Sequence, residues 1–207
     1  MGSAFMARRL ALDEPEASAL RVHYWQRYGA TMLGMIRHHD VDADEFLRET
    51  HPFPDIDTIV ARDHGLREAL RRLPGRKVVV TNAPVAYARA VLRRLGIAPM
   101  LDGLVAVESM RFAGRFHPKP SRPMLRRIVA RLRVSPRRCV LVEDSARNLV
   151  SARACGLRTV LVTGLAWRMR DLDRPPRAGS GRRIDVSVHS ASHLPRIVHR
   201  VRTQTAA

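Results

Sequence analysis

The stretch CVLVEDSARNLVSARACGLRTVLVT, residues 139–163, contains an apolar run, a helical pattern that stops at Gly156, and a second apolar run. The first run ends on two adjacent acids, Glu143 and Asp144. Valine- and leucine-rich runs without polar alternation are typical of strands buried on both faces of a sheet. We therefore expect a strand, a helix and a second strand parallel to the first.

The same alternation of strand and helix extends over the second part of the chain, starting with a helix predicted over 58–73. Such an order is typical of an α/β protein with a doubly wound, Rossmann-like parallel sheet. The segment RPPRAGSGRR, residues 174–183, predicts a loop. The predicted strands are 77–82, 104–108, 139–143, 158–163 and a short last one at 184–188.

Residues 4–50 have the pattern of a group of helices. Asp13 is placed as the N-cap of one helix, and Asp42 as the N-cap of another. Gly29 and Gly34 are expected to bracket a short segment between these two helices. The predicted organisation is a helical region at 1–57 and an α/β core at 58–207.

Length and composition favour one domain with a sizeable core, because the chain has 207 residues. No apolar run approaches the roughly 18 residues of a membrane span, so we expect a cytoplasmic protein without a membrane partner. The two cysteines, Cys139 and Cys155, lack the spacing of metal ligands and are expected to be buried free thiols.

The formal net charge of +18 raises the question of nucleic-acid binding. The chain has 35 arginines spread over every segment and only two lysines, Lys77 and Lys119. No aromatic residues are interleaved with a basic repeat, as they are in proteins that stack bases. We therefore expect no specific nucleic-acid partner, although polyanions should bind nonspecifically at low salt.

Polar residues with matching chemistry follow the ends of the predicted strands, where parallel sheets bind their ligands. Thr81 and Asn82 end one strand just before a helix, whose N-terminal amides attract anions. Glu143 and Asp144 offer the hard oxygen ligands that Mg²⁺ prefers. Lys119 lies between two prolines that stiffen its loop, where its ammonium would meet a phosphate as a point charge.

Each of these features also has an ordinary structural interpretation. A threonine after a strand often caps a helix, paired acids often lie in a solvated turn, and a lysine between prolines is often plain surface. Their order along the chain, at successive strand ends, favours a shared site for phosphate and Mg²⁺.

At these residues the chain resembles the haloacid dehalogenase-like hydrolase superfamily, in particular its pyrimidine 5'-nucleotidase-like branch. VVVTNAPVAYARAVLRRLGI is similar to the second motif of the family, FHPKPS to the third, and VLVEDSARNLVSARACGLRTVLV to the fourth. The helical segment HYWQRYGATMLGMIRHH resembles the small cap of that branch. The resemblance covers about residues 10–165.

The resemblance implies a role for each matching residue. Thr81 would be the phosphate-binding hydroxyl, with Asn82 beside it, and Lys119 would steady the nucleophile and the phosphate. Asp144 would hold Mg²⁺, with Glu143 acting directly or through water. Ser145 and Asn148 fit the same fourth motif.

The implied function is Mg²⁺-dependent hydrolysis of a small phosphorylated metabolite, with nucleoside 5'-monophosphates as the expected substrates. The paired acids favour a phosphatase over a dehalogenase, because carbon–halogen cleavage in this superfamily needs no metal. The alternative is a catalytically inactive member that acts as a binding or regulatory protein.

The sequence departs from the family at the first motif, an apolar strand that ends in Asp-x-Asp-x-Thr and supplies the attacking carboxylate. Neither HDVDADE nor PDIDTIV follows an apolar strand, and we interpret their acids as helix caps and solvated turns. The chain is therefore expected to lack the central first strand of the sheet, and with it catalytic activity. A late start codon, a truncated gene and a trimmed chain each explain this, and we favour translation that begins upstream.

Without that strand, the two strands beside it would each lose a hydrogen-bonding partner. Every buried amide or carbonyl left unpaired costs about 1–3 kcal/mol. Direct pairing of the two strands, or donation of a strand by another chain, would relieve this cost.

Several residues of the helical region also invite a functional interpretation. Tyr24 and Tyr28 recur at helical spacing and are expected to pack together rather than to stack on a base. Adjacent histidines on a helix point to different faces, so His38 and His39 are expected to pack or face solvent rather than to bind a metal.

Overall fold

The computed structural model describes residues 2–52, 55–164 and 184–197. The chain forms two compact units, each built from two stretches of sequence. The first unit contains Met1–Arg62 and Lys77–Lys119, and the second contains Asp63–Arg76 and Pro120–Ala207.

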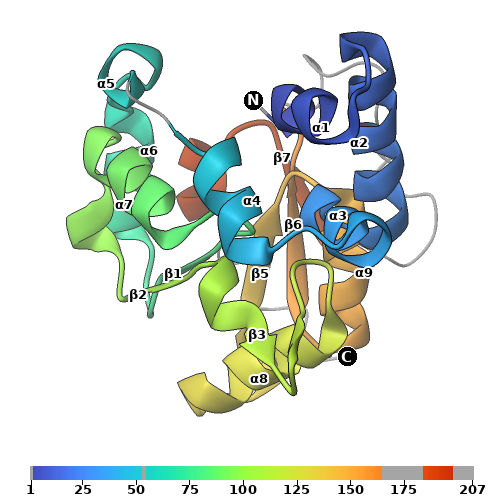
Figure 1. The fold of residues 1–207 in the computed structure, drawn as a ribbon. Coiled ribbons are helices and arrows are strands. Elements are labelled where there is room, and N and C mark those ends of the chain that lie inside the picture. Colours follow the sequence, from blue (N-terminus) through green and yellow to red (C-terminus); the bar gives the residue numbers. More distant parts are fainter. Residues whose placement is uncertain (1, 53–54, 165–183, 198–207) are drawn as a thin grey trace. The chain divides into compact units, whose positions relative to one another are not determined.

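The first unit begins with four helices: α1 (Gly2–Leu10), α2 (Glu14–Tyr28), α3 (Thr31–His39) and α4 (Ala43–Thr50). Their apolar faces share one core, which includes Phe5, Met6, Tyr24, Met35 and Phe46. The rings of Phe5 and Phe46 meet edge to face with centroids 5.3 Å apart. Figure 1 shows these helices in the blue colours of the early sequence.

The helix caps predicted for this region are confirmed. Asp13 accepts a hydrogen bond from the amide of Glu16 at 2.8 Å, and the Glu16 carboxylate accepts from the Asp13 amide at 3.1 Å. This reciprocal pair satisfies two amides at the start of α2. Asp42 caps α4 through the amide of Glu45 at 2.9 Å.

The boundary expected at Gly34 is wrong. Gly34 lies inside α3. A glycine is needed there because the ring of buried Tyr24 packs against its Cα and leaves no room for a side chain. Gly29 does end α2, with the left-handed backbone φ of 83° that glycine adopts readily.

The rest of the first unit contains a short parallel pair of strands and a hairpin. β1 (Val78–Val80) pairs with β2 (Gly103–Val105), with Val79 opposite Leu104. β3 (Arg111–Phe112) and β4 (Arg115–Phe116) form an antiparallel hairpin that the sequence analysis did not predict. The other elements are α5 (Ile56–Ile59), α7 (Val85–Arg94) and the 3₁₀ turns η1 (Ala98–Met100) and η2 (Val107–Met110).

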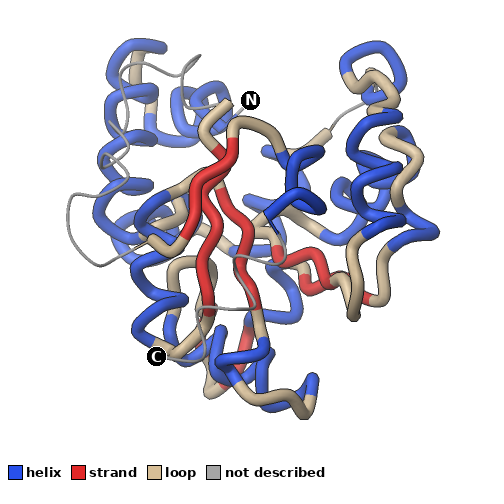
Figure 2. The backbone as a smooth tube through the Cα atoms, turned by 180° about the vertical axis from the view of Figure 1, so that it is seen from behind, coloured by secondary structure: helices blue, strands red, loops and turns tan. Residues whose placement is uncertain are grey.

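The second unit contains a three-stranded parallel sheet, drawn side by side in Figure 2. β6 (Arg158–Val162) lies between β5 (Val140–Glu143) and β7 (Val186–Val188), with Val160 opposite both Val142 and Val186. The remaining elements are α6 (His64–Arg72), α8 (Arg122–Leu132), α9 (Ala146–Ala154) and the 3₁₀ turns η3 (Pro136–Arg138) and η4 (Ala191–His193).

The predicted α/β alternation with parallel strands is confirmed, and two boundaries are corrected. The helix expected over 58–73 is two helices, α5 and α6, because Asp63 starts a new helix by accepting from the amide of Leu66 at 2.8 Å. The strand expected at 104–108 ends at Val105. The loop at 174–183 lies outside the described residues, and the division at residue 57 remains a prediction.

Of the described strands, β6 alone has a partner on both sides, and β1 and β5 are among those paired on one side. Within the described residues, β1 pairs with β2 alone and β5 with β6 alone. Burial follows the pairing, since Val140 of β5 is 45% exposed whereas Val160 of the central β6 is 1% exposed. Each unpaired edge presents backbone groups that can accept another strand.

The cysteines differ slightly from expectation, since Cys139 and Cys155 are free but half-buried rather than buried. Partial burial raises the pKa of the Cys139 thiol, against the opposing effect of the nearby Arg76 charge.

In the described ranges, none of the helices has the length and apolar character needed to cross a membrane.

Candidate active site

The turn that follows β1 positions Thr81 at the end of the strand. The Thr81 amide donates to the carbonyl of Val105 at 3.0 Å, which extends the β1–β2 pairing by one residue. Its Oγ1 accepts from the amide of Ala83 at 3.1 Å. Because Oγ1 is the acceptor in that bond, the hydroxyl hydrogen can be donated to an anion.

Asn82 joins this turn to the Lys119 loop. Its Oδ1 accepts from the Lys119 amide at 2.8 Å, and its Nδ2 donates to the Lys119 carbonyl at 3.1 Å. The two residues are 37 positions apart, so this double contact fixes the main chain of Lys119 beside the end of β1. The structure thus brings together Thr81, Asn82 and Lys119, all three half-buried.

Glu108 is a residue of this region to which the sequence analysis assigned no role. Both of its carboxylate oxygens accept from the amide of Val85, at 2.9 and 3.1 Å. Val85 is the first residue of α7, and the preceding Pro84 provides no side-chain cap. The anion at this end of α7 is therefore the protein's own carboxylate.

His51, after the end of α4, lies in the same unit near Tyr87 of α7, with ring centroids 5.8 Å apart. Its Nδ1 is 2.9 Å from Thr50 Oγ1 and 3.2 Å from the Leu47 carbonyl. Burial lowers the pKa of His51, although the Leu47 carbonyl and the Glu108 charge oppose this shift. His51 therefore favours its neutral form near neutral pH.

The acid pair lies in the second unit, at the end of β5. Glu143 is half-buried and accepts a hydrogen bond from Nδ2 of Asn148, in the first turn of α9. Asp144 is exposed and lies directly before Ser145, the N-cap residue of α9. One carboxylate is thus held by the protein, and the other faces solvent.

These acids fit Mg²⁺ by their chemistry, since that ion is commonly bound by one or two carboxylates together with water and substrate phosphate. Over the described residues, no group of three or more histidine, cysteine, aspartate or glutamate side chains could enclose a metal ion. Glu143 and Asp144 belong to a different unit from Thr81, Asn82 and Lys119, so the meeting of the two sets remains a prediction.

The aromatic residues of the helical region pack as the sequence analysis expects. The Tyr24 hydroxyl is 2.7 Å from Nε2 of His39, and the Tyr28 hydroxyl is 2.6 Å from Nε2 of His38. Tyr24 also stacks on His38, with ring centroids 5.5 Å apart. Burial, with a smaller effect of the His38 charge, lowers the pKa of His39.

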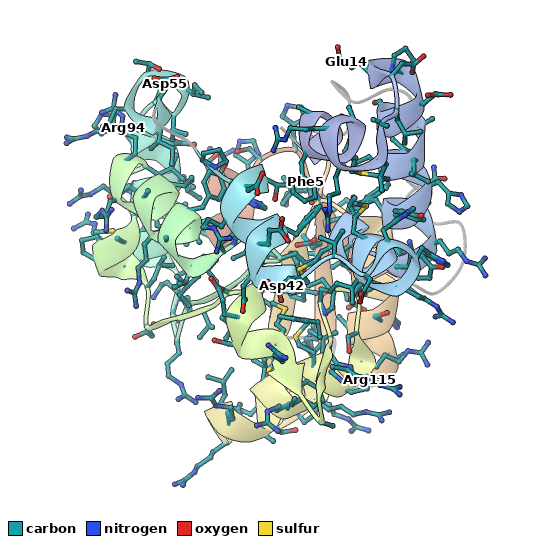
Figure 3. The ribbon with its side chains drawn as sticks, in the orientation of Figure 1. Phe5, Glu14, Asp42, Asp55, Arg94 and Arg115 are labelled. Atoms are coloured by element: carbon teal, nitrogen blue, oxygen red, sulfur yellow. The ribbon has the colours of Figure 1, made fainter. Side chains whose placement is uncertain are left out.

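Three of the aspartates weighed as substitutes for a first motif, Asp42, Asp55 and Asp57, make contacts that stabilise local structure. Asp42 caps α4, and the Asp55 carbonyl accepts from the Thr58 hydroxyl at 2.8 Å. Asp57 pairs with Arg94 of α7 at 3.6 Å. Figure 3 shows Asp55 and Arg94 at neighbouring ends of α5 and α7.

A family model for haloacid dehalogenase-like hydrolases matches residues 6–156, which include the segments 78–97 and 116–121 and most of the segment 140–162. The chain belongs to the haloacid dehalogenase-like hydrolase family. A phosphatase from Thermococcus onnurineus, also of this family, has a similar fold, with a TM-score of 0.55 at 20% identity over 95% of this chain and 86% of that one. The Rossmann-like α/β fold expected from the sequence is thereby confirmed.

Two curated relatives of this haloacid dehalogenase-like protein are phosphatases. One is the N-acetylmuramic acid 6-phosphate phosphatase of Pseudomonas aeruginosa, 27% identical over 74% of this chain and 56% of its own length. The other is a fructose-1-phosphate phosphatase of Escherichia coli, 30% identical over 55% of this chain and 53% of its own. The chain thus spans about half the length of these relatives.

Proposed function

We propose that the protein is a Mg²⁺-dependent phosphomonoesterase that acts on a small phosphorylated metabolite. The observation that carries the proposal is the double hydrogen bond between Asn82 and the main chain of Lys119. It fixes the main chain of Lys119 beside the turn that carries Thr81, at the carboxyl end of a parallel strand, and the proposal is that a phosphate meets both side chains there.

The residues of the first unit would bind and orient the phosphate. The Thr81 hydroxyl would donate a hydrogen bond to one phosphate oxygen, and the Lys119 ammonium would offset negative charge on another. Asn82 would act through Lys119, by fixing the backbone from which the ammonium extends. Glu108 would keep the first turn of α7 in place through the Val85 amide.

The acid pair would hold the metal in the proposed enzyme. Asp144 would be a direct ligand, and Glu143 would bind directly or through water, with its orientation fixed by Asn148. The bound ion would offset charge on the phosphate oxygens. This role requires the two units to bring Asp144 toward the Thr81 and Lys119 turn, which is part of the proposal.

For the substrate, nucleoside 5'-monophosphates remain the prediction made from the sequence. The names of the relatives broaden the test to sugar phosphates, since they specify fructose 1-phosphate and N-acetylmuramic acid 6-phosphate. A panel of these esters, assayed for phosphate release by a version of the protein extended upstream to include the first motif, would discriminate between the two classes. Higher turnover of sugar phosphates than of every nucleotide would contradict the nucleotide prediction.

The metal assignment predicts that Asp144→Asn weakens Mg²⁺ binding at least about tenfold, because a neutral amide replaces a charged ligand. Isothermal titration with Mg²⁺ in the presence of inorganic phosphate measures the effect. Asp44→Asn is the matched control, because Asp44 is exposed in the first turn of α4. Equal Mg²⁺ affinity in both variants would remove Asp144 from the metal site.

Turnover of a generic phosphate ester completes this test. Residues 1–207 contain no apolar strand that ends in Asp-x-Asp-x-Thr, so we expect Mg²⁺ and phosphate to bind without turnover. A version extended by the sequence encoded in frame upstream should gain activity if it adds that motif. Activity of the 207-residue chain that is lost in Asp144→Asn would show that its catalytic set is complete.

The role of Asn82 predicts that Asn82→Ala weakens phosphate binding by about tenfold while leaving the fold intact. The variant removes two hydrogen bonds, each worth about 1 kcal/mol, and releases the Lys119 backbone. Asn82→Asp is the closer comparison, because it can still accept from the Lys119 amide but repels the Lys119 carbonyl. Hydrogen exchange at the Lys119 amide should accelerate in Asn82→Ala, and unchanged exchange would contradict the assignment.

A further inference from the structure

The segment from Pro120 to Val142, in the second unit, carries seven arginines and no aspartate or glutamate. It contains helix α8, the turn η3 and most of β5. All seven side chains belong to residues that are exposed to solvent. They are Arg122, Arg126, Arg127, Arg131, Arg133, Arg137 and Arg138, and together they are called the α8 arginine face.

Helix α8 separates its residues cleanly between two faces. Met124, Leu125 and Val129 are buried, whereas the arginines of the helix occupy the exposed positions. The helix is held at both ends, since Ser121 accepts from the Met124 amide and Arg76 donates to the Leu132 carbonyl. The arginines are therefore displayed by an anchored helix, and Figure 3 shows nitrogen-tipped side chains extending from it.

The arrangement does not serve the stability of α8. Arg122 and Arg126 are four residues apart, as are Arg127 and Arg131, and like charges at this spacing repel on a helix. Arg122 also lies in the first turn, where the helix dipole favours an acid, and that turn contains none.

Some arginines on other helices of the described chain pair with acids. Arg8 of α1 pairs with Glu49, and Arg71 and Arg72 of α6 share Glu68. By contrast, the structure over its described ranges gives no ion pair to three arginines of α8, namely Arg122, Arg126 and Arg131. Exposed arginines such as Arg9 and Arg89 likewise have no ion pair in the described ranges, but the segment from Pro120 to Val142 is distinguished by seven arginines with no acid among them.

The composition of the face indicates the chemistry of its partner. Residues 120–142 include no aromatic side chain that could stack on a base. Among described residues of α8 and η3 no large apolar side chain is exposed, and in the described part of β5 only Val140 is. Insertion into a membrane, or the centre of a protein interface, requires more exposed apolar surface than one valine. What remains is a set of guanidinium groups, which bind phosphate through paired hydrogen bonds.

We propose that the α8 arginine face binds the phosphate backbone of double-stranded nucleic acid without reading its sequence. The net charge implies a weak attraction of the whole protein to polyanions. In this proposal, most of that attraction comes from the α8 arginine face. It involves none of the residues assigned to the phosphate and metal site, so it stands apart from the proposed hydrolase activity.

The test measures binding of a fluorescent 30-base-pair DNA duplex by anisotropy over a range of salt concentrations. Each arginine that neutralises a phosphate contributes about 0.9 to the slope of log affinity against log salt concentration. The variant R122Q/R126Q/R131Q/R137Q should therefore have a slope shallower by about 3–4, and should bind at least about tenfold more weakly at low salt.

The matched control is R9Q/R48Q/R89Q/R93Q, which removes four exposed arginines of the first unit. We expect its slope to change by less than about 1. The thermal midpoint should not fall in the α8 variant, because the change relieves like-charge repulsion. An equal loss of slope in both variants, or affinity for polyglutamate or phosphatidylglycerol vesicles equal to that for the duplex, would overturn the proposal.

Discussion

Replacing Asp185 with alanine is expected to lower the free energy of unfolding by about 2–4 kcal/mol. Asp185 Oδ2 accepts from the amide of Thr159 at 2.8 Å and from its hydroxyl at 2.9 Å. Thr159 lies in β6 and is fully buried, so alanine leaves two buried donors without their acceptor. Urea unfolding followed by circular dichroism at pH 7 measures the loss.

Arg153→Ala separates this hydrogen bonding from the ion pair of the same carboxylate. Arg153 also donates to Asp185, but its side chain is 43% exposed, so the pair should contribute no more than about 1 kcal/mol. We expect the loss in Asp185→Ala to exceed the loss in Arg153→Ala at least twofold. Equal losses would assign the stabilisation to the ion pair instead.

The pH dependence of the free energy of unfolding is a second test of the role of Asp185. Burial opposes ionisation, but hydrogen bonds from Arg153 and Thr159 outweigh it and lower the pKa of Asp185 below its ordinary value. A lowered folded-state pKa means that this stabilisation is fully present above the unfolded pKa of about 3.9 and is lost as the pH falls through the folded value. The stability gap between wild type and Asp185→Asn should therefore narrow as the pH falls below about 4.

The strands and caps could be predicted because their signals are local. A run such as VVVT is long enough to indicate a buried strand, and an aspartate three residues before a free amide indicates a cap at Asp13 and Asp42. Asp63 has the same signature before HGLRE and could have been recognised. The hairpin also had a signal, since RFAGRF places Ala113 and Gly114, both with positive φ, between two identical pairs.

The contacts of the candidate site were less accessible from sequence because they join distant positions. The strand-end rule places Thr81 and Lys119 in the same region, but the pairing of Asn82 with the Lys119 backbone depends on the path of 37 residues. Glu108 was assigned to a strand, whereas it follows a strand that ends at Val105 and turns toward Val85. Gly34 was mistaken for a helix boundary because Tyr24, which requires it, is ten residues away.

Gly34→Ala is expected to destabilise the protein by about 1–3 kcal/mol, although alanine normally stabilises a helix interior relative to glycine. A Cβ at this position would lie no farther than 2.6 Å from three carbons of the Tyr24 ring. Tyr24 is 6% exposed and stacks on His38, so its ring cannot move without disturbing the packing of α2 and α3. Thermal unfolding monitored by near-ultraviolet circular dichroism would show a lower midpoint.

A second glycine provides the matched control, because replacing it with alanine should raise the free energy of unfolding rather than lower it. Gly65 lies in α6, and a Cβ there would be 3.4 Å from Asp63 Oδ1 and 3.7 Å from Ser192 Cβ, which are ordinary contacts. Gly65→Ala should therefore stabilise by about 0.4–1 kcal/mol. If Tyr24 is the cause, Gly34→Ala should cost much less in a Tyr24→Leu background, and an unchanged cost there would place the strain elsewhere in α3.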